Sequence, residues 1–201
     1  MTPVIKAFCT DVGFDITNTA LQCFGGHGYI REYGMEQFVR DARIAQIYEG
    51  TNGVQAMDLL GRKVPDDGGR LVKRFMSVAQ RDLASAAERP AVRELATSVG
   101  TALESLGRVT MTTMARAAQD PQEIGAAAVD YLRLFGLVAT AWMWVRMAAV
   151  ADAGGTANPV AATKLATATF FVTKLLPESQ ALVQRIEAGA APVMALDASA
   201  F

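Results

Sequence analysis

The sequence has few of the residues that build metal centres and disulfide frameworks. Its 201 residues include two cysteines and one histidine, and Cys9, Cys23 and His27 do not have the spacing of a zinc site. We therefore expect neither a metal site nor a disulfide. Both cysteines are expected to be small buried hydrophobic side chains in a reducing compartment.

A charge of one sign is also lacking. The 19 basic and 20 acidic residues leave a net charge of −1. Nucleic acids and anionic membranes attract strongly cationic surfaces, so neither is expected as a partner.

The first residues lack the basic and apolar regions of a signal peptide, so a cytoplasmic location is expected. The 14 arginines against 5 lysines are compatible with a GC-rich bacterial genome. Residues 131–150 have the length of a membrane span but include Arg133 and Arg146. Charges inside a span are costly, so we expect a buried helix of a bundle instead.

What the sequence does have is helix-forming composition. Alanine is the commonest residue, with 36 copies, and β-branched runs are short, which together favour an all-α fold. Thr2 is a candidate N-cap with Pro3 at the first helical position. Helical periodicity predicts helices over 3–23, 35–48, 54–64, 71–89, 91–118, 121–153, 158–176 and 177–187, followed by a frayed tail.

The clearest break is Pro65-Asp66-Asp67-Gly68-Gly69, which predicts two domains, 1–64 and 71–201, joined by a linker at 65–70. Beyond it, short breaks at Pro90, Pro121, Gly154-Gly155 and Pro159 separate the helices. Helices joined by short connections pack as antiparallel neighbours. We therefore expect an antiparallel bundle, with four to five helices in the second domain.

Two places could carry chemistry. The glycine-rich stretch from Gly25 to Tyr29 is predicted as a loop that follows a helix, so it is not a dinucleotide-binding fingerprint. Such a loop is either a helix cap with a tight turn or a place where backbone N–H groups approach a phosphate. Glu49 lies where two apolar helices join, so removal from water would make it a usable base. The alternative is a solvated carboxylate near a helix N-terminus.

Three linked segments, Ala20–Tyr29, Arg40–Ile44 and Ile47–Gly53, closely resemble the C-terminal helical region of acyl-CoA dehydrogenases. Residues 55–63 and the helices beyond are similar to the long members of the 3-(methylthio)propionyl-CoA dehydrogenase type.

This resemblance implies an FAD-dependent enzyme that oxidises an acyl-CoA thioester to its trans-2-enoyl-CoA. It implies that Glu49 is the catalytic base and that Tyr48 and Gly50 contact the substrate. The positions that would contact FAD are Gln22, Cys23, Phe24, Gly25, Gly26, Thr51, Asn52 and Gly53. Arg40, Asp41 and Arg43 match a family signature, and we expect them to form a structural ion-pair network.

The resemblance covers only the C-terminal part of such enzymes, and the parts that normally precede it supply most of the flavin and CoA sites. We therefore expect the isolated chain to be inactive. The implied partners are an acyl-CoA substrate, an electron transfer flavoprotein, the N-terminal domains and further copies in a dimer or tetramer.

An alternative function is a non-catalytic helical assembly module, with Trp142 and Trp144 as interface anchors. These tryptophans would otherwise belong to the core of the bundle. Peripheral membrane association through the second domain is a third possibility, although the sequence has no basic amphipathic face.

Overall fold

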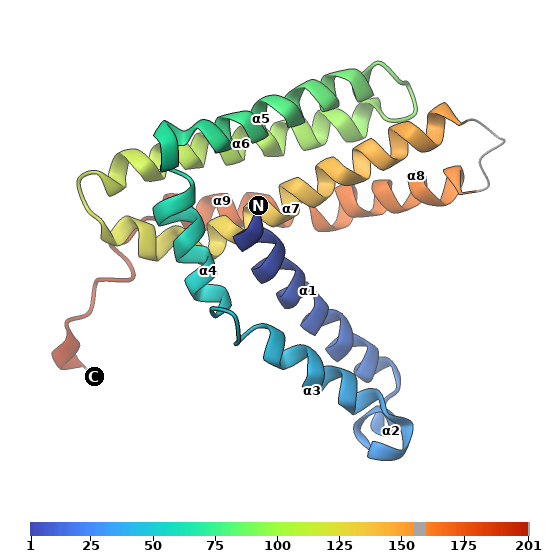
Figure 1. Cartoon of the computed structure of the whole chain (residues 1–201), viewed down its shortest axis with the longest axis horizontal. Helices are drawn as coiled ribbons and strands as arrows, with labels where there is room; N and C mark the ends of the chain where they lie inside the picture. The colour runs from blue at the N-terminus through green and yellow to red at the C-terminus, as the bar shows by residue number, and fades with distance from the viewer. Residues whose placement is uncertain (155–159, 201) are drawn as a thin grey trace.

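The computed structural model describes residues 1–154 and 160–200, and every regular element in these ranges is helical (Figure 1). The expected all-α fold is thereby confirmed. The α-helices are α1 (Thr2–Cys23), α2 (Gly26–Tyr29), α3 (Met35–Ala45), α4 (Asn52–Asp58), α5 (Asp66–Ala87), α6 (Arg93–Ala117), α7 (Gln122–Ala153), α8 (Ala161–Phe170) and α9 (Glu178–Glu187). Shorter elements are the 3-10 helices η1 (Arg31–Tyr33) and η5 (Ala198–Ala200) and the π-helical segments η2 (Leu59–Lys63) and η4 (Phe171–Leu175).

Helices α5 to α8 run antiparallel in sequence order, as expected, and α9 continues from η4 along the bundle (Figure 1). Helix α7 is central, because α1, α4, α5, α6, α8 and α9 all pack against it. Its side chains are apolar around most of its circumference, as befits a helix buried on several sides. Its most enclosed residues are Tyr131, Leu134, Val138, Ala141, Val145 and Ala148.

Helix α7 is also long and apolar enough to cross a membrane, by length and composition alone. More than half of its most apolar stretch is buried within the fold. The core helix of a bundle has the same properties, so the expected bundle helix is what the structure shows at residues 131–150.

The two tryptophans are half-buried and pack against the core. Trp142 meets Phe75 of α5 edge-on, with ring centroids 5.6 Å apart. Arg146 lies over the Trp142 ring and Lys164 over the Trp144 ring, at 5.3 and 5.5 Å from the centroids. These contacts favour a place in the core over the interface alternative.

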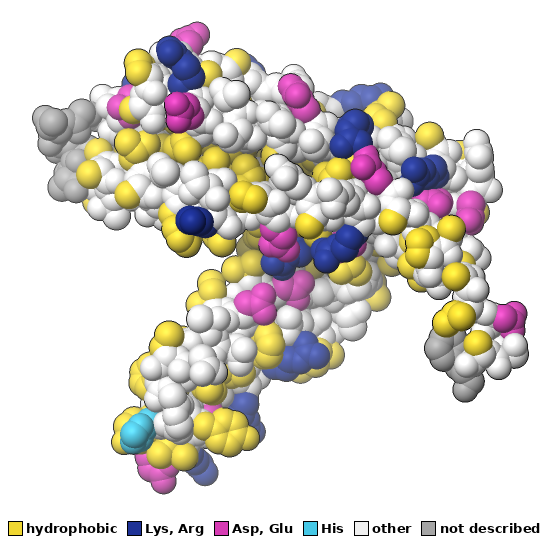
Figure 2. Space-filling view, turned by 180° about the vertical axis from the view of Figure 1, so that it is seen from behind, with side chains coloured by type: hydrophobic (Ala, Val, Ile, Leu, Met, Phe, Trp, Pro, Cys, Tyr) yellow, Lys and Arg dark blue, Asp and Glu magenta, His cyan; other side chains and the backbone are white. Residues whose placement is uncertain are grey.

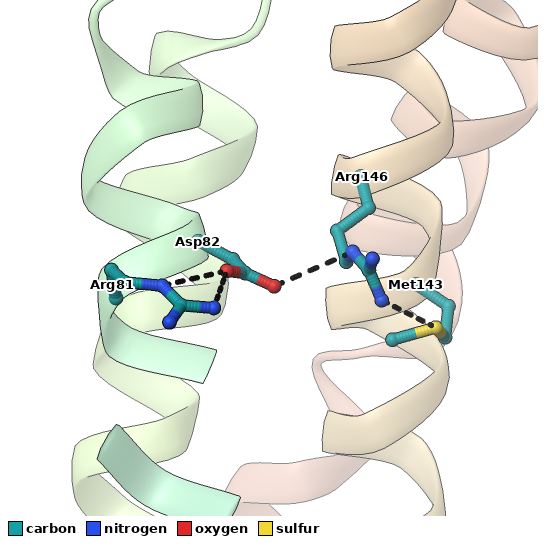
Figure 3. Close-up of polar contacts among 4 residues, drawn as sticks. All are labelled: Arg81, Asp82, Met143 and Arg146. Carbon is teal, nitrogen blue, oxygen red and sulfur yellow. Dashed lines mark hydrogen bonds and ion pairs between the residues drawn. The ribbon is translucent and has the colours of Figure 1, made fainter. Parts of the chain in front are cut away.

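Polar contacts join the helices at the surface of the bundle. Asp82 of α5 accepts from Arg81 at 3.0 Å and lies 3.4 Å from Arg146 of α7, whose guanidinium also points to the Met143 sulfur (Figure 3). Partly exposed pairs of this kind contribute at most about 1 kcal/mol each. Apolar burial around α7 therefore dominates the stability of the bundle.

The second half of α1, together with α2, η1 and α3, projects from the bundle as an arm (residues 11–45; Figures 1 and 2). Helix α3 has no buried residue, and the buried residues of α1 are confined to Pro3, Val4 and Ala7. Gly28 is the only buried residue described in the arm. Its exposed large apolar side chains are Ile16, Phe24, Tyr29, Ile30, Tyr33, Phe38 and Ile44.

Several local expectations were wrong. Both Cys9 and Cys23 are exposed, because they lie on α1 outside its buried residues, Pro3, Val4 and Ala7. Helix α1 begins at Thr2, with Met1 at the N-cap position, so Thr2 does not cap it. The stretch from Gly25 to Gly34 contains α2 and η1 rather than a simple loop.

The predicted linker is a tight turn. Asp67, Gly68 and Gly69 all have positive φ, at 50°, 60° and 77°, and two glycines make this conformation accessible. The expected breaks at Gly155 and Pro159 lie outside the described residues.

A buried tyrosine provides a test of the core. The Thr110 hydroxyl donates to the Leu106 carbonyl at 2.7 Å and lies 2.8 Å from the Tyr131 hydroxyl. Burial raises the pKa of Tyr131 from 10.0 to about 12, against a smaller opposing effect of the Thr110 hydrogen bond. Because the fold favours the neutral phenol, this stabilisation is complete below pH 10 and is lost as the pH rises towards 12.

We expect Tyr131→Phe to cost about 1 kcal/mol of unfolding free energy at pH 7, through loss of the buried hydrogen bond. Between pH 10 and 12 the wild type should lose roughly 2 kcal/mol relative to this variant. Urea unfolding followed by circular dichroism at several pH values measures both effects. Parallel pH profiles for the two proteins would contradict the assigned burial.

A second prediction concerns the junction of α1 with the bundle. A Cβ added at Gly136 would lie 2.3 Å from the Phe8 ring, whereas one added at Gly125, also in α7, would meet nothing within 4 Å. Overpacking costs about 1–3 kcal/mol, and alanine at an open helical position gains about 0.5–1 kcal/mol over glycine. Gly136→Ala should therefore destabilise the chain and Gly125→Ala should stabilise it, as measured by urea unfolding. A stabilising Gly136→Ala change would show that Phe8 does not hold this position.

Candidate functional site

The turn that carries Glu49 lies between α3 and α4. Helix α3 ends at Ala45. The N–H groups of Ile47 and Tyr48 then donate to the Ile44 carbonyl, at 3.0 and 3.1 Å. Glu49 and Gly50 then follow with φ of 57° and 78°. A non-glycine residue in this left-handed region costs roughly 1 kcal/mol, so other contacts must hold Glu49 there.

The far side of the turn begins a new helix. The Thr51 hydroxyl accepts from the Val54 N–H at 3.4 Å and caps α4. Gln55, one turn into α4, donates to the Glu49 carbonyl at 3.1 Å. A Cβ at Gly50 would lie 3.0 Å from the same amide nitrogen, so glycine leaves room for this contact.

The first turns of α1 hold the motif from behind. Lys6 donates to the Gly50 carbonyl at 2.8 Å and to the Asn52 amide oxygen at 2.7 Å. The Asn52 amide nitrogen reaches Thr10 at 2.9 Å and Asp11 at 2.7 Å, and it also lies 3.2 Å from the Ala7 carbonyl.

Asp11 also accepts from Gln46 at 2.7 Å, so contacts from α1 hold both ends of the turn.

The turn presents its functional groups outward. Tyr48 is 54% exposed, and Glu49 and Gly50 are exposed as well. In this chain Glu49 is therefore a solvated carboxylate, the alternative considered above, and the burial expected at the helix junction is not present.

The residues predicted to contact FAD lie in two separate places. Thr51, Asn52 and Gly53 lie beside the first turns of α1, whereas the segment from Gln22 to Gly26 lies at the other end of that helix. Lys6 and Gln22 are about 24 Å apart along the axis, at 1.5 Å per residue. One copy of the chain does not bring the two segments around one cofactor.

The two places differ in how open they are to a ligand from outside the chain. Gly25 has φ 59° and ψ −145°, a conformation that glycine alone adopts readily, and nothing lies within 4 Å of a Cβ at Gly25 or Gly26. Backbone at these two positions is therefore open to a bulky ligand. The amide of Asn52 differs, because its hydrogen bonds are used within the chain.

The expected ion-pair network was wrong. Arg40 lies 3.7 Å from Glu36, and Asp41 accepts from Gln37 at 2.7 Å, so both make contacts one turn away on α3. Arg43 donates to Gln46 at 2.6 Å and lies over the Phe14 ring. Arg43 therefore braces α3 against α1.

His27 makes an edge-on ring contact with Tyr33 at 4.9 Å. Among the described residues there is no group of three histidine, cysteine or acidic side chains that could hold a metal ion.

Sequence reasoning missed the residues that hold the turn, Lys6, Asp11, Gln46 and Gln55. One signal was present. Lys6, Thr10 and Asp11 form a polar stripe along a helix that is otherwise marked by its apolar periodicity.

Comparison with known families matches the whole motif region. Residues 1–64 match the family described as "Acyl-CoA dehydrogenase, C-terminal domain". Residues 71–197 match the family described as "Acetyl-CoA dehydrogenase C-terminal like".

Individual acyl-CoA dehydrogenases are also similar in sequence to the chain. The chain is 39% identical to 3-methylmercaptopropionyl-CoA dehydrogenase of Ruegeria pomeroyi, over 92% of the chain and 32% of that protein. It is 30% identical to the broad-specificity linear acyl-CoA dehydrogenase FadE5 of Mycobacterium tuberculosis, over 100% of the chain and 35% of that protein. The chain thus spans about a third of the length of these relatives.

A solved structure shares the fold. ACDH-11 of Caenorhabditis elegans, crystallised in complex with C11-CoA, superposes with a TM-score of 0.73 at 19% identity, over 96% of this chain and 32% of that one. The fold, the three sequence motifs and the two family matches agree: this chain belongs to the acyl-CoA dehydrogenase family and corresponds to the C-terminal part of its long members.

Proposed function

We propose that the chain is the part of an FAD-dependent acyl-CoA dehydrogenase that carries the catalytic base, Glu49. The observation that supports this most directly is the turn itself. Glu49 is held in a left-handed conformation between α3 and α4, with its carbonyl bound by Gln55 and the next carbonyl bound by Lys6. Its carboxylate is exposed, and a substrate supplied from outside the chain can reach it.

The proposed chemistry is the removal of one hydrogen from each of two adjacent carbons. Glu49 takes the α-proton of the acyl thioester, and proton transfer to a positioned side chain contributes about 10²–10⁴-fold to the rate. FAD, when bound, supplies the acceptor for the hydride that leaves the β-carbon. The product is the trans-2-enoyl thioester, and Tyr48 and Gly50 border the substrate on either side of the base.

The rest of the substrate and flavin site is supplied by N-terminal domains and by a second copy of the chain. The arm exposes large apolar side chains and has no core of its own, and such patches mark interaction sites. The two FAD-contacting segments lie at opposite ends of α1. Both observations support an assembly in which N-terminal domains and a second copy enclose the flavin, with the isolated chain inactive.

The substrate and the electron acceptor belong to the same proposal. ACDH-11 was crystallised with C11-CoA, and the relatives are named for acyl-CoA substrates. We therefore assign an acyl-CoA substrate to this chain as well, with an electron transfer flavoprotein as the acceptor.

A second candidate is a non-catalytic assembly module. It is favoured by the same uncovered arm and by the solvated state of Glu49. In this function the arm forms the contact between chains, and the motif residues carry no chemistry.

The two candidates are separated by Glu49→Gln. The chain would be coexpressed with a polypeptide matching the first two-thirds of the Ruegeria pomeroyi enzyme, and the complex supplied with FAD and butyryl-CoA. We expect turnover per bound flavin to fall by about 10²–10⁴-fold, with flavin content unchanged, because the substitution is nearly isosteric. The measurement is reduction of an artificial acceptor, together with the flavin absorbance of the purified complex.

Glu104→Gln provides the matched control, because Glu104 is an exposed glutamate of α6 remote from the turn. Its turnover should equal that of the wild type. A wild-type complex that binds no FAD, or a Glu49→Gln complex with normal turnover per flavin, would exclude the catalytic function and leave the assembly module.

A further inference from the structure

The contacts that fix the Glu49 turn converge on one side chain. Of the hydrogen bonds that reach the backbone of Glu49 and Gly50 from other side chains, one comes from Gln55, only six residues away. The other comes from Lys6, 44 residues away on α1. Lys6 is therefore the side chain that ties the backbone of Glu49 and Gly50 to a different helix.

Lys6 makes a second bond that strengthens the first. Its ammonium also donates to the Asn52 amide oxygen at 2.7 Å, so Asn52 is oriented with its nitrogen towards Thr10 and Asp11. Charge-assisted hydrogen bonds of this kind are shorter and stronger than neutral ones. The Lys6 ammonium thus binds both the Gly50 carbonyl and the side chain of Asn52, the first residue of α4.

The part of α1 that carries Lys6 is anchored. Val4 and Ala7, on either side of Lys6, are 3% and 1% exposed and belong to the core around α7. The neighbouring arm has no such core. A bond from Lys6 therefore fixes the turn relative to the bundle, whereas α3 alone could not.

We propose that Lys6 is a positioning residue for the catalytic base: it holds Gly50 and Asn52 so that the left-handed turn directs the Glu49 carboxylate at the substrate. The inference rests on the proposed function of Glu49. The inference also gives Asn52 a role within the chain, because Lys6, Thr10 and Asp11 hold the start of α4 through hydrogen bonds to the Asn52 amide.

The first test uses the chain by itself. Lys6→Met keeps a long unbranched side chain and removes every N–H donor. We expect amide exchange at Asn52, whose N–H donates to the Gln46 carbonyl at 3.1 Å, to become at least about ten-fold faster, since an open turn exposes that amide. Exchange in the core of α7 should not change.

Matched variants separate this effect from a general loss of stability. Lys174 is an exposed lysine of η4 whose side chain makes no hydrogen bond or ion pair to any described residue, so Lys174→Met should leave exchange at Asn52 unchanged. Lys6→Arg retains a cation and its donors and should restore protection at least in part. Unchanged exchange at Asn52 in Lys6→Met would overturn the proposal without reference to any activity.

The second test uses the complex with the Ruegeria polypeptide. We expect Lys6→Met to lower kcat at least ten-fold while KM stays within about three-fold, because the substrate still binds and the base is misdirected. Lys6→Arg should recover most of kcat. Faster exchange combined with normal kcat would overturn the positioning role and leave Lys6 as a structural contact.

The same complex distinguishes failure of the two proposals. If Glu49→Gln abolishes turnover and Lys6→Met does not lower it, the catalytic function stands and the role of Lys6 is refuted. If Glu49→Gln has no effect, the catalytic function fails, and the positioning role of Lys6 fails with it.

Discussion

The ring of Phe8 lies where a side chain at position 136 would begin, and this contact lets α1 lie directly against α7. With Phe8 in place, Val4 and Ala7 enter the core. Lys6, Thr10 and Asp11 on the same turns of α1 then hold the chain around Glu49. The geometry of the Glu49 turn therefore depends on the packing of a helix pair some distance from it along the chain.

The helices of the bundle could be predicted because their signals are local. Proline and glycine mark their ends, and α7 is apolar on nearly every side. The hydrogen bonds from Lys6 that hold the Glu49 turn could not be predicted in this way, since Lys6 and Asn52 are 46 residues apart. Periodicity within one helix does not show which distant carbonyl a lysine will meet. The left-handed conformation of Asp67 was likewise hidden in a stretch whose glycines indicated only a break.

The exposure of Cys9, Cys23 and Glu49 has a different cause. Cys9 and Cys23 lie on α1, Glu49 lies in the turn between α3 and α4, and all three have apolar sequence neighbours, which usually predict burial. Only Pro3, Val4 and Ala7 of α1 are buried, and α3, which packs mainly against α1, has no buried residue, because two helices cannot enclose a core. The apolar composition of residues 11–45 thus exceeds what the fold of one copy can bury, which fits a chain that spans a third of its relatives.

The central place of α7 also affects how the chain folds as it is synthesised. Helices α1 and α4 are synthesised before α7, and the helix that they pack against ends about ninety residues after them. At about 5–20 residues per second, the first 64 residues wait for some 5–20 s before their packing surface exists. Their apolar faces cannot be covered by α7 during that interval, so the packing of the first 64 residues has to wait until α7 has been made.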